Sequence, residues 1–127
     1  MIESFYNETK PLTEYEKATL LPVMVNCLSK HIGEGQAITN GKMCEALNGK
    51  GYNVNETRIR KLINHIRING LVKCLVATSK GYFVATEAHE LKSHISSLKG
   101  REDAIKAVRN ALAEQLEDLD NKSPIKE

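Results

Sequence analysis

The sequence of 127 residues predicts a mainly α-helical fold with one small β-hairpin and a long C-terminal helix. Three patterns predict it. Apolar residues recur at three- and four-residue steps in separate segments before residue 70. A run of β-forming residues follows, divided by a Ser-Lys-Gly turn at 79–81. From Glu87 to Leu119 the sequence favours helix, with Gly100 as its weak position.

The first helix is expected to begin at Thr13, because Thr-Glu-Tyr-Glu is a capping box in which Glu16 can reach back to the Thr13 amide. Pro22 removes one amide donor and is expected to kink this helix or split it in two. Residues 1–12 are polar and are predicted to be a flexible N-terminal arm. The apolar positions that define the helix are Ala18, Leu21, Val25, Leu28 and Ile32.

Two further helices and a hairpin are expected. Thr39 is an N-cap candidate for a short helix. Asn55 caps a third helix that ends at Asn69-Gly70 and carries one apolar stripe. The segments 71–77 and 82–85 are predicted strands of a hairpin. The stripe residues are Ile59, Leu62, Ile63 and Ile66.

Helix, short helix, helix and hairpin, in that order, is the arrangement of a winged helix-turn-helix domain, which is expected over residues 13–85. In this fold the helix that follows the turn enters the major groove of DNA, with its N-terminal half nearest the bases.

The segment from Asn55 to Val72, followed by Ser-Lys-Gly-Tyr-Phe-Val, resembles the DNA-binding domain of biotin-repressor-like regulators. In that family a recognition helix ends in a glycine, and the return strand of the wing begins with Gly-Tyr. Gly70 and Gly81-Tyr82 occupy those places here. Residues from about 12 to 116 are also similar to small winged-helix proteins of phages and mobile elements, in which a helix like 91–98 follows the wing. No biotin binding is implied, because no ligase domain follows.

Basic charge is concentrated in one quarter of the sequence. Residues 55–85 contain six basic residues and one acid, whereas 1–54 and 86–127 are each slightly acidic. A clustered basic patch is typical of a protein that binds a polyanion. The basic residues of this segment are Arg58, Arg60, Lys61, Arg67, Lys73 and Lys80.

A helical projection of the third helix places Thr57, Lys61 and Asn64 opposite its apolar stripe, flanked by Arg60 on one side and by Arg58 and His65 on the other. Such side chains read base edges and phosphates, although a polar helix face can also be merely solvated. Ile68 projects near this face and is expected to tuck under the hairpin. Lys80, at the hairpin tip, can reach a phosphate or simply favour solubility. The candidate DNA-contacting residues are Asn55, Thr57, Arg58, Arg60, Lys61, Asn64, His65, Lys73 and Lys80.

An enzyme, a metal site and a cofactor are not expected. Cys27, Cys44 and Cys74 fit no zinc pattern and are expected to be reduced thiols. His89 and His94 are five residues apart, which does not place them on one helix face. No nucleophile elbow or phosphate loop occurs. With no apolar run that could span a membrane and no secretory signal, a cytoplasmic protein is expected.

Residues 86–120 carry an apolar stripe that Glu102 interrupts, and 121–127 are predicted to be a disordered tail. A continuous helix over this region would be too long for one small domain to cover. Either the chain bends near Gly100 and folds back, or the stripe from Ile105 onward meets a second subunit in a two-fold homodimer. The stripe comprises Leu91, Ile95 and Leu98, followed by the candidate dimerisation residues Ile105, Val108, Leu112, Leu116 and Leu119.

Together these patterns predict sequence-specific binding of double-stranded DNA, by a transcriptional regulator or a replication accessory factor of a phage or mobile element. The alternative is a winged-helix module that binds another protein and not DNA, because fold does not settle function.

Overall fold

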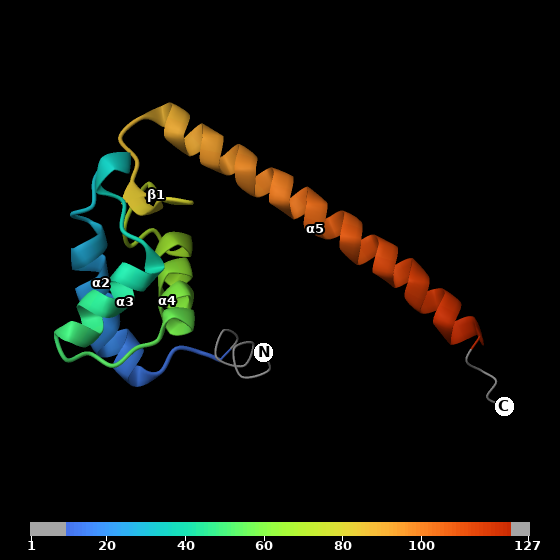
Figure 1. Cartoon of the computed structure of the whole chain (residues 1–127), viewed down its shortest axis with the longest axis horizontal. Helices are drawn as coiled ribbons and strands as arrows, with labels where there is room; N and C mark the ends of the chain where they lie inside the picture. Colours follow the sequence, from blue (N-terminus) through green and yellow to red (C-terminus); the bar gives the residue numbers. More distant parts are fainter. Residues whose placement is uncertain (1–9, 123–127) are drawn as a thin grey trace. The chain divides into compact units, whose positions relative to one another are not determined.

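The computed structural model describes residues 10–122 and divides the chain into two compact units, with the boundary between Leu91 and Lys92 (Figure 1). The predicted fold class is confirmed: the chain is mainly helical, with one two-stranded antiparallel hairpin and a long C-terminal helix. In chain order the elements are η1 (Glu16–Leu20), α2 (Leu21–Leu28), η2 (Glu34–Gln36), α3 (Asn40–Gly49), α4 (Glu56–Ile68), β1 (Leu75–Thr78), β2 (Gly81–Val84) and α5 (Ala88–Lys122).

The first helix starts with the predicted capping box. The Thr13 amide donates to Glu16 Oε1 at 2.9 Å, and the Glu16 amide donates to Thr13 Oγ1 at 3.1 Å. Pro22 does not split the helix. Instead, the π-helical turn η1 precedes it, and the Leu21 amide bonds to the Glu16 carbonyl.

The expectation that this helix continues to Ile32 is wrong. It ends at Leu28, and Ile32 is 53% exposed. Ile32 forms a parallel bridge with Val84 of β2. The backbone of this segment pairs with a strand more than fifty residues later in the chain, and the helical spacing of its apolar residues gives no sign of that.

Helices α3 and α4 begin at the predicted caps. Thr39 Oγ1 accepts a hydrogen bond from the Lys42 amide at 3.2 Å, and Asn55 Oδ1 accepts one from the Arg58 amide at 2.8 Å. Both helices pack with α2 around one core, so their apolar faces are fixed inward. The buried members of this core are Leu20, Met24, Leu28, Met43, Leu47, Ile59, Leu62, Ile63, Ile66, Val72 and Leu75.

The hairpin is shorter than predicted. Its first strand begins at Leu75, because the chain from Leu71 to Cys74 turns and Cys74 adopts a positive φ of 62°. The strands are joined by the two-residue loop Ser79-Lys80, which lies within the predicted Ser-Lys-Gly turn, while Gly81 already belongs to β2. The other edge of β2 is covered: Ile38 and Tyr82 exchange backbone hydrogen bonds of 3.0 and 2.8 Å. A third extended segment, which sequence patterns did not reveal, therefore supports the hairpin.

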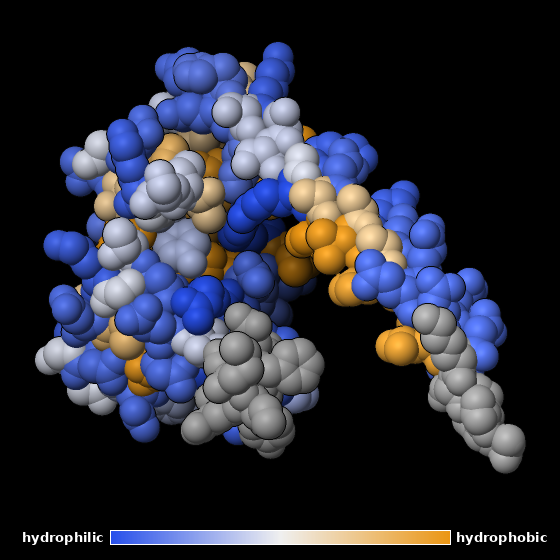
Figure 2. Space-filling model, turned by 45° about the vertical axis from the view of Figure 1, so that its right-hand side comes forward, coloured by the Kyte–Doolittle hydropathy of each residue, from blue (hydrophilic) through white to orange (hydrophobic). Residues whose placement is uncertain are grey.

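Helix α5 begins at Ala88, at the end of the first unit, and runs without interruption through Gly100 to Lys122, so the predicted alternative of a bend near Gly100 is wrong. Figure 2 shows apolar side chains gathered along one side of α5. The predicted tail is wrong for Asn121 and Lys122, which belong to the helix, and 123–127 lie outside the described residues. The five predicted dimerisation residues are each at least 57% exposed: Ile105, Val108, Leu112, Leu116 and Leu119.

Candidate nucleic-acid interface

The orientation of α4 is set by its buried face. Ile59, Leu62, Ile63 and Ile66 are each at most 1% exposed, so rotation of the helix about its axis would bring apolar surface into water. Since α4 is a regular helix of 13 residues, the residues on the opposite side face outward. The core of the domain thereby presents one defined polar surface of α4 to solvent.

Two adjoining hollows lie on this surface. The first is lined by Arg60, Lys61, Asn64 and His65 of α4, together with Leu12 and Tyr82 from elsewhere in the fold. Arg67 and Lys73 line the second, which also shares Asn64 and Ile68 with the first. We call the combined region the α4 surface; it consists of Arg60, Lys61, Asn64, His65, Arg67, Ile68, Lys73 and Tyr82.

The α4 surface is strongly basic. It brings together the predicted cations Arg60, Lys61 and Lys73 and adds Arg67. Among the described residues that line the two hollows, none is acidic. A surface that carries four cationic side chains attracts a polyanion by direct charge attraction.

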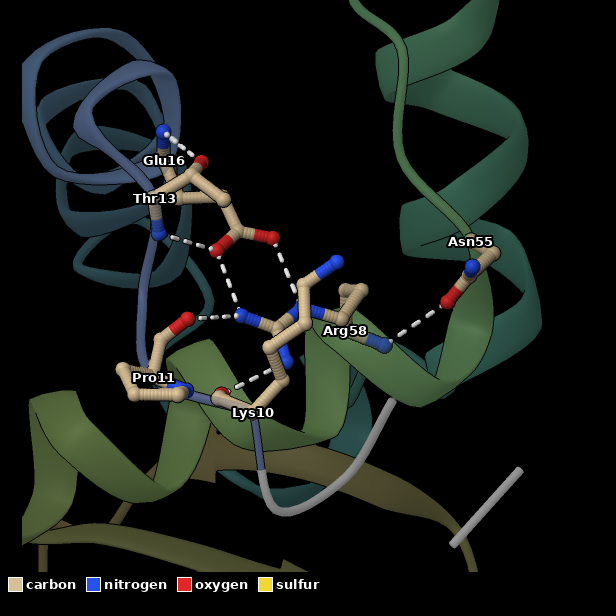
Figure 3. A network of polar contacts seen from close by, with 6 residues as sticks. All are labelled: Lys10, Pro11, Thr13, Glu16, Asn55 and Arg58. Atoms are coloured by element: carbon tan, nitrogen blue, oxygen red, sulfur yellow. Dashed lines mark hydrogen bonds and ion pairs between the residues drawn. The ribbon is translucent and has the colours of Figure 1, made fainter. Parts of the chain in front are cut away.

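Arg58 does not belong to this surface, and its prediction as a DNA-contacting residue is wrong. Its side chain is turned inward against the start of the first helix (Figure 3). Its Nε donates to Glu16 Oε2 at 2.8 Å and its Nη2 donates to Glu16 Oε1 at 2.6 Å. Both side chains are under 10% exposed. A helical projection of α4 places Arg58 at the edge of the polar face, and the contact with Glu16 decides which way it points.

The same guanidinium fixes the segment before the first helix. Arg58 Nη1 donates to the Lys10 carbonyl at 2.9 Å, and Nη2 donates to the Pro11 carbonyl at 3.0 Å. Leu12 packs against the core. The predicted flexible arm is therefore wrong for residues 10–12, whereas residues 1–9 lie outside the described part of the chain.

The contact with Arg58 shifts the pKa of the Glu16 carboxyl group. The hydrogen bonds from Arg58 hold the pKa of Glu16 below its ordinary value of 4.5, against the opposing effect of burial. The carboxylate in turn raises the pKa of the Arg58 guanidinium. Both groups are thus held in their charged forms, and the pair works as a structural anchor for α4.

Other predicted contacts are already engaged within the protein. The Asn55 carboxamide oxygen caps α4, as described above. Lys80 Nζ lies 3.3 Å from Glu34 Oε2 in an ion pair whose side chains are 67% and 52% exposed. Such an exposed pair contributes little stability, so Lys80 can exchange Glu34 for another anion at low cost. Thr57 Oγ1 accepts a hydrogen bond from Arg60 at 3.4 Å.

Tyr82 links the hairpin to α3 and also lines the α4 surface, and it was not among the predicted site residues. Its hydroxyl donates to Asn40 Oδ1 at 3.4 Å. Burial raises the pKa of Tyr82, while the charges of Arg60 and Arg67 lower it in part. Those arginines therefore lie close enough to act on the ring hydroxyl. The Gly81-Tyr82 pair marks the start of the second strand in the sequence, but it does not indicate that Tyr82 lies near Asn40, Arg60 and Arg67.

Ile68 is 83% exposed, so the expectation that it tucks under the hairpin is wrong. It lies between the two hollows, beside Asn64. The α4 surface therefore contains one large, exposed apolar side chain among its polar ones.

No family model matches this sequence, and comparisons with curated proteins and with solved structures also find no match. Within residues 10–122, no three His, Cys, Asp or Glu side chains cluster closely enough to hold a metal ion. None of the helices in that range is both long and apolar enough to cross a membrane.

Proposed function

We propose that this protein binds double-stranded DNA in a sequence-specific manner, with α4 in the major groove. The observation that carries the proposal is the α4 surface, where four Arg and Lys side chains surround Asn64 and the described lining has no acid. An α-helix fits the major groove, and cations beside it neutralise backbone phosphates.

The side chains on α4 divide between base reading and phosphate contact. Arg60, Lys61 and Asn64 occupy the middle of the exposed face; Arg and Lys bind guanine there, and Asn binds adenine. Arg67 and Lys73, at the far end of the same surface, are suited to phosphate oxygens. Lys80 at the hairpin tip adds a contact when it leaves Glu34.

A regulator of transcription or an accessory factor of replication in a phage or mobile element, working in the cytoplasm, is the biological role that we favour. Such a factor needs reversible and selective attachment to DNA, and the α4 surface offers polar recognition groups on a rigid support.

A second candidate, a module that binds another protein, is favoured by two exposed apolar side chains. Ile68 is 83% exposed and Leu71 is 46% exposed, at the C-terminal end of α4. Exposed apolar side chains next to polar groups are typical of protein contact surfaces. The two candidates differ in salt dependence, because phosphate contacts release counterions and apolar contacts do not.

Binding to a mixed-sequence duplex is expected to weaken steeply with salt. With phosphate contacts from Arg67, Lys73 and Lys80, log Kd against log salt should have a slope of about 2–3 per protomer, since each phosphate contact contributes about 0.9. Fluorescence anisotropy from low to moderate salt measures it. Lys61→Ala should cost about 1–3 kcal/mol of binding if Lys61 reads a base, and less for a phosphate.

Lys50→Ala is the matched control, because it removes the same charge from a hollow lined by α2 and α3 residues and not by the α4 surface. It should bind like the unchanged protein. If no duplex binds at low salt, the DNA proposal fails and the protein-binding module replaces it. If Lys50→Ala and Lys61→Ala weaken binding equally, the contact is unspecific charge attraction and α4 is not the reading element.

A further inference from the structure

Helix α5 carries a heptad repeat. Leu98, Ile105, Leu112 and Leu119 follow one another at seven-residue intervals. A second set lies three residues before the next member of the first: Ile95, Glu102, Arg109 and Leu116. Two such sets form the seam of a coiled coil, where each side chain inserts between four residues of the facing helix. The apolar members of this seam are 38–69% exposed.

The seam contains two charged residues of opposite sign. In a parallel pair of α5 helices, Glu102 would face Glu102 of the other copy, and Arg109 would face Arg109. Like charges in a coiled-coil seam are unfavourable, because they are partly removed from water without a partner. An antiparallel pair avoids both clashes and brings each Glu102 near an Arg109.

The distribution of charged residues along α5 also favours an antiparallel pair. Residues 92–109 contain five basic and two acidic side chains, whereas 110–121 contain four acidic and no basic ones. In a parallel pair, the basic half of one helix would lie against the basic half of the other, and the acidic half against the acidic half. In an antiparallel pair each basic half lies against an acidic half, which is electrostatic complementarity over the whole length of the helix.

We propose that α5 pairs with α5 of a second copy of this chain in the antiparallel direction, with Ile95 of each copy opposite Leu119 of the other. This register uses every exposed seam residue, from the first to the last. A shift by one heptad would place Leu116 against Leu91, which is already half-buried and lies in the first unit.

This register makes specific pairs. Leu98 lies opposite Leu116 of the other copy. Glu102 and Arg109 of the other copy are offset by three residues along the axis, or about 4.5 Å at 1.5 Å per residue, which long side chains span. Val108 of each copy meets its counterpart near the two-fold axis. The pairing does not depend on DNA binding, and it gives a particle with two α4 surfaces.

The orientation is tested by disulfide trapping. In a Cys74→Gly background, which removes the one cysteine that is exposed among the described residues, Leu98→Cys and Leu116→Cys are made separately. Glycine suits position 74 because its φ is positive. On mild oxidation, the mixture of the two variants should form a covalent dimer, and neither variant alone should do so. Covalent dimers of each variant alone would show parallel helices and overturn the proposal.

The charged pair gives a second measurement that leaves the apolar seam intact. By sedimentation equilibrium the unchanged chain should form a particle of twice 14.2 kDa. Glu102→Arg and Arg109→Glu should each raise the dimer dissociation constant about tenfold or more, and the double variant should return to within about threefold of the original. A monomer at micromolar concentration, single variants without effect, or a double variant that is not rescued would each contradict antiparallel pairing.

Discussion

Arg58→Ala is expected to lower the free energy of unfolding by about 3–5 kcal/mol, because it leaves a buried carboxylate without its partner. Glu16 is 6% exposed and accepts two hydrogen bonds from the Arg58 side chain. The Lys10 and Pro11 carbonyls lose donors at the same time. Urea denaturation followed by circular dichroism measures the loss.

Arg60→Ala is the matched control, since it removes the same side chain from an exposed position two residues later in the same helix. Its unfolding free energy should change by about 0.5 kcal/mol or less, and its DNA affinity should fall. The opposite outcome, a stable Arg58→Ala protein that has lost DNA binding, would return Arg58 to the DNA-contacting face and contradict the structure.

The same pair makes stability depend on pH. The hydrogen bonds from Arg58 lower the pKa of Glu16 in the folded state, so the unfolded state binds the proton more readily. The stabilisation is fully present above the ordinary pKa of 4.5 and is lost as pH falls through the lower, folded value. Glu16→Gln should remove this part of the pH dependence. If the unfolding free energy of the Glu16→Gln variant falls at acidic pH as it does in the unchanged protein, other carboxyl groups cause that fall.

Gly81→Ala is expected to cost about 3–5 kcal/mol of unfolding free energy, the second large effect. Gly81 has a φ of +122°, and a Cβ there would lie 2.5 Å from the Ile38 carbonyl oxygen and 2.9 Å from the Thr39 nitrogen. Backbone atoms cannot move aside as the end of a side chain can. The added methyl would therefore break the pairing of β2 with Ile38, and thermal unfolding should show a large fall in Tm.

Gly70→Ala is the control that separates the effect of a positive φ from the effect of the steric clash at Gly81. Gly70 also has a positive φ, of +65°, but a Cβ there would have nothing within 4 Å. Its cost should be about 1–2 kcal/mol, the penalty of the left-handed region alone. Equal losses for the two variants would mean that the close approach of Gly81 to Ile38 is not what holds the hairpin.

The local parts of this fold could be predicted from the sequence. The caps at Thr13, Thr39 and Asn55 and the Ser-Lys-Gly turn at 79–81 each depend on residues within three or four positions of one another. The buried stripe of α4 followed equally well from its spacing. These features are encoded by short-range hydrogen bonds and by helical periodicity, which a single sequence displays directly.

The errors come from contacts between distant residues. Arg58 and Glu16 are 42 residues apart, and nothing near either one shows that they pair. The pairing of Ile38 with Tyr82 likewise joins separate segments, so the third extended segment was missed. Arg67 was counted in the basic segment but left out of the site, because the helical projection did not show that Lys73 lies beside it.

The central claim, that the α4 surface reads DNA, is tested most directly by mapping the contact on the folded protein. A duplex enriched from a random-sequence pool is added to the isotopically labelled chain, and amide chemical shifts are followed by NMR. The largest changes are expected at Arg60, Lys61, Asn64 and Lys73, with little change at Lys50 and along α2. Enrichment of no sequence, or changes centred on α2 and α3 instead of α4, would contradict the claim.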